Sequence, residues 1–263
     1  MSTVTQRGES VIDLRVERTA PAPGPVPNWL FREVHRPGAF LFPLRLFIAI
    51  GWLRSFAEHL GDARWMGGAA VGDFVESQTS AGAIVFPGYE WLVSSVIGPA
   101  GGLVGWLVML LQLGIGLAIL TGSFANLAFL VGIVLNINFM LAGEVNPSAF
   151  YILIQSVLFV TGAGAVFGFD GHRSSHLGRS ILLVARPDTR GMSAEDRWAI
   201  SSLAVLAATV AWLGFTHVHD FSPTGVGDPG LVLGTVMALA TLLLVILRLR
   251  MVDVRKLARR RIT

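Results

Sequence analysis

Long apolar stretches dominate this sequence and restrict its fold more than any other feature. A helix needs roughly 20 mainly apolar residues to cross a membrane, and only 14% of the residues here are charged, against about 25% in a soluble domain. In lipid the backbone must satisfy its own hydrogen bonds, as a helix does. We therefore predict an all-α integral membrane protein. Its six predicted spans cover residues 39–57, 103–121, 124–142, 148–168, 198–216 and 231–250.

The positions of the basic residues predict how these spans are oriented. Cytoplasmic segments of membrane proteins are enriched in Lys and Arg. Of the 20 Lys and Arg residues, 17 lie before Pro37, in the loop 169–197 or from Arg248 onward. Six spans place all three segments on one side, so we predict a multi-pass protein of the cell (plasma) membrane with both termini in the cytoplasm. The net charge of +3 then indicates topology and attraction to anionic lipid rather than a nucleic-acid partner.

The spans divide the chain into five segments. Residues 1–38 contain the Pro-rich stretch APAPGPVP, and we expect a disordered cytoplasmic tail there. A four-span bundle follows over 39–170, with an outward loop at 58–102. Within that loop, PGYEWLVSSVIGPAGG predicts a short helix that lies on the membrane. The remaining segments are a basic cytoplasmic loop over 171–197, a two-span helical hairpin over 198–250 and a basic cytoplasmic tail over 251–263.

Polar side chains interrupt the first span, where charge is costly and is often retained for function. At about 100° per residue, Arg45, Trp52 and His59 share one stripe of the helix. Arg54 and Glu58 share another stripe, roughly opposite the first. One interpretation is structural: Arg45 snorkels to the cytoplasmic headgroups, and Arg54 forms an ordinary surface ion pair with Glu58.

The other interpretation is a quinone site at the outer end of this span. Reducing a quinone takes two electrons and two protons, so its site needs hydrogen-bond donors and titratable groups that pass protons. Arg54 would donate to a quinone carbonyl, Trp52 would stack on the ring, and Glu58 or His59 would relay protons. The candidate catalytic residues are therefore Arg54, Glu58 and His59, and the candidate quinone-binding residues are Trp52, Arg54 and Asn138.

Amide side chains lie inside the predicted spans at Gln112, Asn136, Asn138 and Gln155. A buried amide in lipid must find a hydrogen-bond partner. Hydrogen bonds between helices are one interpretation, and the lining of a polar cavity is the other. In the second case Asn138 contributes to the quinone site.

Several cofactors are excluded or weakly supported by the sequence. The chain has no cysteine, which rules out disulfides, Cys-ligated iron–sulfur clusters and covalent haem. No phosphate-binding Gly-rich loop or zinc-protease motif is present. His217, His219 and Asp220 lie close together, as do His172 and His176, but neither group has a full ligand set. We expect no metal, so a redox role requires a quinone or a partner subunit.

The first span also resembles a known family. LRLFIAIGWLRSF is similar to the opening span of the DoxX/DoxD membrane proteins, in which an Arg-Leu pair comes early and a Gly-Trp pair precedes a basic residue. Arg45 matches the early pair, and Trp52 with Arg54 matches the later motif. YEWLVSSVIGPAGGLVGWLVMLLQLGIGLAILTG, LNINFMLAGEVNPSAF and GAGAVFGFD resemble later parts of the family, so the resemblance covers about residues 39–170.

The resemblance implies a four-helix membrane bundle with redox partners, because some members are subunits of a thiosulfate:quinone oxidoreductase. Three functions follow as hypotheses. The first is a quinone-linked subunit that acts, if it is an enzyme, on a reduced sulfur compound. The second is a non-catalytic scaffold or anchor for a redox or stress-response complex, working with a partner subunit or as a homo-oligomer. The third, a transporter, is less favoured because the middles of several spans carry almost no polar residues.

Overall fold

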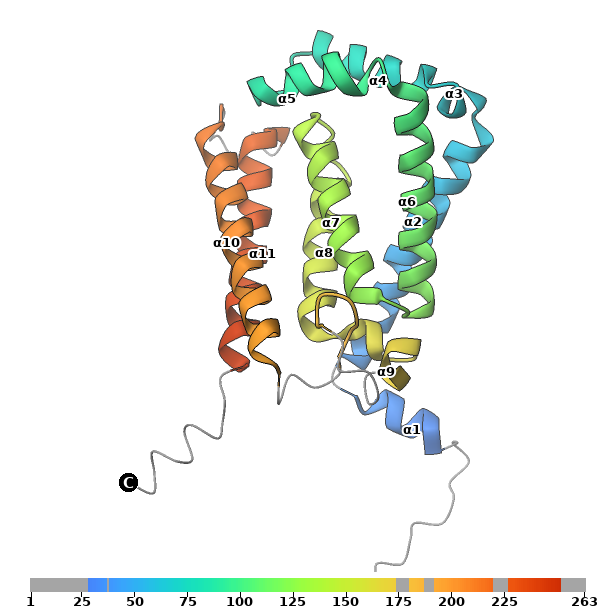
Figure 1. The fold of residues 1–263 in the computed structure, drawn as a ribbon, viewed down its shortest axis with the longest axis vertical. Helices are drawn as coiled ribbons and strands as arrows, with labels where there is room; N and C mark the ends of the chain where they lie inside the picture. The colour runs from blue at the N-terminus through green and yellow to red at the C-terminus, as the bar shows by residue number, and fades with distance from the viewer. Residues whose placement is uncertain (1–27, 37, 174–179, 187–191, 220–226, 252–263) are drawn as a thin grey trace, which may run out of the picture.

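The chain folds into an upright helical bundle with shorter helices crossing each end (Figure 1). The computed structural model describes residues 28–36, 38–173, 180–186, 192–219 and 227–251. Over these residues every regular element is a helix. The predicted all-α membrane class is therefore confirmed. Most of the predicted N-terminal tail and nearly all of the C-terminal tail lie outside the described residues.

Four helices are long and apolar enough to cross a membrane. They are α2 (Phe42–Gly61) with the preceding 3-10 turn η1 (Ala39–Leu41), α6 (Gly101–Thr121), α10 (Ala194–Thr216) and α11 (Pro229–Arg250). Two further apolar helices, α7 (Ala125–Leu141) and α8 (Ser148–Thr161), have 17 and 14 residues. Six spans and the orientation of the termini remain predictions.

The fourth predicted span, 148–168, is helical only in its first two thirds. The helix α8 ends at Thr161, because Gly162 adopts a left-handed φ of 65° that an L-residue rarely takes. The chain then forms a 3-10 turn, η3 (Ala163–Ala165), before the short helix α9 (Phe169–Arg173). The Gly-rich stretch that was predicted as the end of a span is therefore a compact turn.

The helices pack mainly in pairs: α2 with α6, α7 with α8, and α10 with α11, and α11 also packs against α8. Glycines allow the last pair to approach closely. A Cβ on Gly214 would lie 2.5 Å from the backbone nitrogen of Gly234, and one on Gly230 would lie 2.4 Å from the His217 carbonyl oxygen. The C-terminal hairpin thus stands beside the first four apolar helices (Figure 1).

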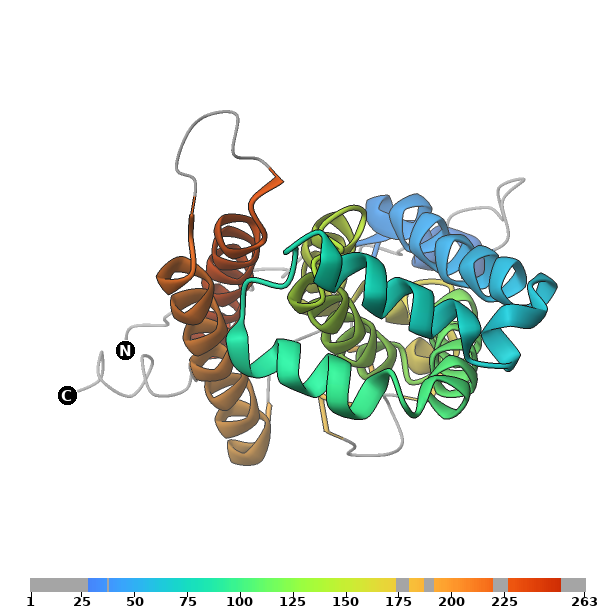
Figure 2. The same ribbon diagram turned by 90° about the horizontal axis from the view of Figure 1, so that it is seen from above.

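The predicted outward loop is largely helical and covers one end of the bundle, which we call the cap end. The helices α3 (Ala63–Met66), α4 (Ala69–Ser80) and α5 (Pro87–Leu92) lie across it, as Figure 2 shows, and a π-helical turn, η2 (Val93–Ile97), continues α5. The short helix predicted from PGYEWLVSSVIGPAGG therefore forms. The opposite end, which we call the basic end, carries α9 and α1 (Asn28–Val34).

Candidate functional site

Arg54 and Glu58 meet, but on the outside of the bundle. Nε of Arg54 lies 2.7 Å from Oε1 of Glu58, and the two side chains are 78% and 58% exposed. The pair has the i,i+4 spacing at which oppositely charged side chains on a helix meet. The predicted ion pair is present, and its exposure gives it the geometry of an ordinary surface pair.

His59 lies apart from that pair and contacts a different group of residues. A ring nitrogen, Nδ1, lies 2.9 Å from Oε1 of the buried Gln112. The imidazole also stacks on the indole of Trp65, with ring centroids 3.7 Å apart. The structure therefore divides the three predicted catalytic residues into an exposed ion pair and a half-buried His–Gln–Trp cluster.

Trp52 is buried inside the bundle rather than placed at its surface. Its side chain is 2% exposed and packs edge-on against Tyr151, with ring centroids 5.7 Å apart. Its indole nitrogen has no hydrogen-bond partner among the described residues. Trp52 therefore does not lie beside Arg54 in a common open site.

The buried amides make fewer contacts between helices than expected. The Gln112–His59 contact does join two helices, but Asn136 donates to the Gly132 carbonyl within its own helix, at 2.8 Å. The amide atoms of Gln155 have no partner in the described part of the chain. Asn138 donates to Val134 O at 2.8 Å and lies on the more exposed side of α7.

A cavity of about 370 Å³, which we call the cap cavity, lies beneath the cap between α6 and α7. Most of its lining side chains are Val, Leu and Ile. In the described part of the chain Asn138 is its one amide, and its aromatic lining residues are Trp65, Phe74, Tyr89 and Phe139. The cavity therefore combines an apolar wall, aromatic rings and one polar pair.

Tyr89 and Asn138 form that polar pair. The Tyr89 hydroxyl donates to the backbone carbonyl of Asn138 at 3.1 Å and to its Oδ1 at 3.2 Å. Burial raises the pKa of Tyr89 to about 12, so its hydroxyl remains a protonated donor into the alkaline range. The predicted residue Asn138 thus lies in a cavity, but Trp52 and Arg54 do not line that cavity.

Trp65 connects the cap cavity to the His59 cluster. One indole both lines the cavity and stacks on the His59 ring. A titratable imidazole therefore stands directly behind the cavity wall. Chemically, the arrangement offers a place for a flat apolar ring, a hydroxyl donor for it, and a nearby group that can exchange protons with water.

A second cavity of about 290 Å³, the hairpin cavity, lies between the α7–α8 pair and the α10–α11 hairpin. Its described lining residues are apolar except for Asn138 and Ser156. Sequence reasoning did not detect either cavity, because each is assembled from apolar residues on separate helices.

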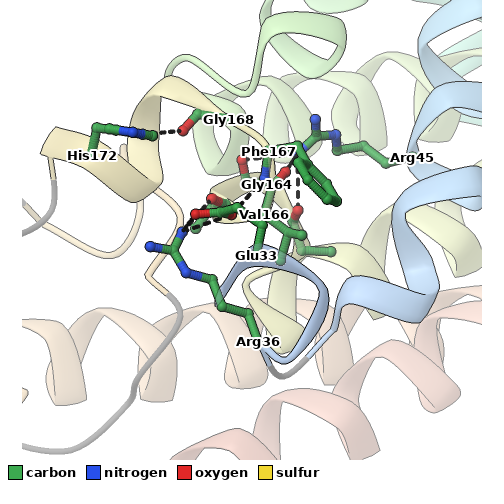
Figure 3. Close-up of polar contacts among 10 residues, drawn as sticks. Glu33, Arg36, Arg45, Gly164, Val166, Phe167, Gly168 and His172 are labelled. Carbon is green, nitrogen blue, oxygen red and sulfur yellow. Dashed lines mark hydrogen bonds and ion pairs between the residues drawn. The ribbon is translucent and has the colours of Figure 1, made fainter. Parts of the chain in front are cut away.

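At the basic end, Arg45 is fully buried and points into the turn after α8 (Figure 3). Its Nη1 donates to the carbonyl oxygens of Ala163, Gly164 and Val166. The predicted snorkelling of Arg45 is therefore wrong. The left-handed Gly162 ends the helix early and turns these carbonyls toward Arg45, so the guanidinium finds its partners inside the protein.

The backbone of the same turn also contacts Glu33 and Arg36, which form an ion pair with each other and are drawn in Figure 3. Glu33 accepts from the Phe167 backbone nitrogen at 3.0 Å and from Arg36 at 3.0 Å, while Arg36 also donates to Ala165 O at 3.2 Å. The end of the predicted disordered tail is therefore a helix fixed to the bundle.

Asp170 and Asp196 fix the neighbouring loop and were not singled out from the sequence. Asp170 is buried and accepts from the backbone nitrogens of Phe124, Ala125 and Ala185 at 2.9 to 3.0 Å. Asp196, also buried, accepts from the Ile181 nitrogen at 2.9 Å. These contacts to backbone nitrogens give Asp170 and Asp196 a structural role. The sequence signal for Asp170 was its position directly after the Gly-rich stretch GAGAVFGF.

The described histidines His217 and His219 make separate contacts. His217 lies 2.9 Å from Leu213 O and packs on Phe86, while the backbone of His219 donates to Asp228. No group of three His, Asp or Glu side chains close enough for a metal occurs among the described residues. Asp220 and His176 lie outside those residues.

Comparison of the chain with protein-family models, curated proteins and solved structures finds no match. The resemblance to the DoxX/DoxD family therefore remains a prediction from the motifs of residues 39–170.

Proposed function

We propose that this protein is the membrane subunit of a quinone-linked oxidoreductase, with the quinone ring in the cap cavity. The supporting observation is the cavity itself: an apolar, aromatic-lined space of about 370 Å³ that ends at the Tyr89–Asn138 pair. A ligand site is typically concave and mostly apolar, with a few polar groups that set orientation. A quinone, with a flat ring and two carbonyls, has matching chemistry.

The residues beneath the cap would then have distinct roles. Trp65, Phe74 and Phe139 pack on the ring faces and edges, and the Tyr89 hydroxyl turns from Asn138 to donate to a carbonyl. His59, behind Trp65, passes protons between the site and water. Arg54 and Glu58 lie at the same end of α2 and form the exposed entrance for protons. This assignment moves the quinone from Trp52 to Trp65.

The electron balance requires a partner. The quinone gains two electrons and two protons and becomes a quinol, while the donor loses two electrons. The chain has no cysteine to hold an iron–sulfur cluster. The resemblance to DoxX/DoxD proteins implies a reduced sulfur compound, oxidised on a partner subunit outside the membrane. The proposal includes six spans in the cell membrane with both termini in the cytoplasm.

Binding can be tested by titrating a quinone into the purified protein in nanodiscs and following tryptophan fluorescence. We expect saturable quenching, of which Trp65→Phe removes a large part. The matched control is Trp198→Phe, since Trp198 is 75% exposed on α10 and lies outside the cap cavity. Quenching that rises linearly without saturation, or that Trp65→Phe leaves unchanged, would contradict a ring site beneath the cap.

Turnover separates an enzyme from a scaffold. With a co-purified donor subunit and thiosulfate, His59→Gln should slow quinone reduction and change its pH profile while leaving the quenching constant unchanged. The control is His35→Gln, at an exposed position just after α1. Saturable binding with no turnover in any preparation of the folded protein would favour the scaffold.

A further inference from the structure

We infer that the quinone tail leaves the cap cavity across α7 and enters the hairpin cavity, so that the α10–α11 hairpin is the wall of a site for one long polyisoprenoid chain. This inference rests on the proposed function and goes beyond it, because it defines the tail that the site accepts. It also gives the last two helices a role.

The two cavities share a boundary. Val134 and Asn138 line both of them. These residues are four apart on α7 and therefore lie on one face of the helix, and both are exposed rather than packed in the core. They form the boundary at which the two cavities meet, which we call the ridge. A flexible chain can cross this ridge without opening the packed interior.

The lining of the hairpin cavity is apolar and therefore suits a hydrocarbon chain. Its two polar side chains are already engaged, since Ser156 donates to Ile152 O at 2.7 Å and the Asn138 amide donates to Val134 O at 2.8 Å. Among the residues that the structure describes, no Lys or Arg lines either cavity. A phospholipid headgroup at the ridge would find no basic partner, whereas an uncharged ring needs none.

The two cavities together are deeper than the hydrocarbon layer of one membrane leaflet. The cap cavity begins beside Val104, in the first turn of α6, and the hairpin cavity reaches Leu244 on α11. Both helices begin at the cap end (Figure 1). Along α7, which lines both cavities, the lining extends from Leu130 to Ala142, roughly 18 Å at 1.5 Å per residue, while half of a hydrocarbon core is about 15 Å. An acyl chain of one leaflet would not fill this path, but a polyisoprenoid tail would.

The hairpin wall supplies a specific test. Ala207 and Ala240 are small, buried and line the hairpin cavity. Ala207→Leu should fill part of the cavity, while Ala208→Leu, the exposed neighbour on the same helix, should not. Two quinones with the same ring are compared, one with a short tail of two isoprene units and one with a long tail of about eight. Binding is measured by tryptophan quenching in nanodiscs.

We expect the long-tail quinone to bind wild type at least about threefold more tightly than the short-tail one. The difference is modest because lipid is as apolar as the cavity, so only packing favours the bound tail. Ala207→Leu should remove the difference and leave short-tail binding unchanged, and Ala208→Leu should preserve it. Equal binding of both quinones to wild type, or equal weakening of both by Ala207→Leu, would overturn the inference while leaving the proposed ring site intact. Failure of both quinones to bind wild type would remove the proposed function as well.

A second measurement uses only the wild-type protein. A long-tail quinone with a photoreactive diazirine at the tail end should label peptides of α10 or α11. A diazirine next to the ring should instead label the cap, α6 or α7. Tail-end labelling confined to the cap and α6, which line only the cap cavity, would overturn the path across the ridge.

Discussion

Two arginines of the same helix occupy opposite surroundings. Arg45 is fully buried and donates to three backbone carbonyls, while Arg54 is exposed beside Glu58. From the sequence alone, both are charged residues within a predicted span. The difference arises from what packs against each: Arg45 faces the turn after α8, and Arg54 faces outward.

Arg45→Gln should therefore destabilise the protein strongly. The shorter, neutral side chain cannot donate to the same carbonyls. Hydrogen bonds from a charged donor at a buried site contribute to stability, so we expect a loss of roughly 3 kcal/mol in the free energy of unfolding. Arg54→Gln on the same helix is the matched control and should leave the melting temperature unchanged. Thermal unfolding in detergent, followed by near-UV circular dichroism, measures both. Equal melting temperatures for the two variants would show that the Arg45 contacts contribute little.

Tyr89 provides a test of burial beneath the cap. Its pKa is raised by burial from the usual value near 10 to about 12. The chain has only two tyrosines, so in Tyr151→Phe the tyrosinate absorbance belongs to Tyr89 and should appear with a midpoint near pH 12. A midpoint near 10 in the folded protein would mean that the hydroxyl is open to water.

The sign of the linked effect on stability follows from the same shift. The folded state keeps the Tyr89 proton at a pH where the unfolded chain has lost it. The contribution of Tyr89 to stability is therefore complete below about pH 10 and is lost as the pH rises toward about 12. Replacing Tyr89 with Phe in the Tyr151→Phe protein should remove this contribution to the pH dependence of the melting temperature.

At the scale of elements, the α10–α11 hairpin depends on close backbone contact. A Cβ on Gly214 would meet the Gly234 backbone at 2.5 Å and 2.8 Å, so Gly214→Ala must push the helices apart. Overpacking of this kind typically costs about 1 to 3 kcal/mol. The control is Gly114→Ala on α6, where a Cβ would have no neighbour within 4 Å. Melting temperatures compare the two, and a neutral Gly214→Ala would indicate that the hairpin separates easily.

For the whole molecule, the basic residues predict the topology. Placing 17 of the 20 on the cytoplasmic side puts the cap outside and α9 inside. The chain has no cysteine, so a single introduced thiol reports its own location. Ser77→Cys on the cap should react with an impermeant maleimide in intact cells, and Ala194→Cys at the start of α10 should react only after permeabilisation. Both side chains are exposed, and labelling of Ala194→Cys in intact cells would reverse the orientation.

The sequence by itself determined the class of fold and the position of most helices. Apolar length and the internal hydrogen bonding that lipid demands are local properties, and they located the helices that became α2, α6, α7, α10 and α11. The i,i+4 spacing of Arg54 and Glu58 was likewise sufficient to predict their ion pair.

Only the tertiary structure decided which partners the buried polar groups contact and where a cavity for a ligand forms. The cap cavity combines Trp65, Tyr89 and Asn138 from three elements separated along the chain, and no periodicity relates their positions. The carbonyls that receive Arg45 lie more than 100 residues away and become available only because Gly162 ends α8 early. Helical period is set by neighbours in sequence, whereas cavities and buried charge partners are set by which faces pack together.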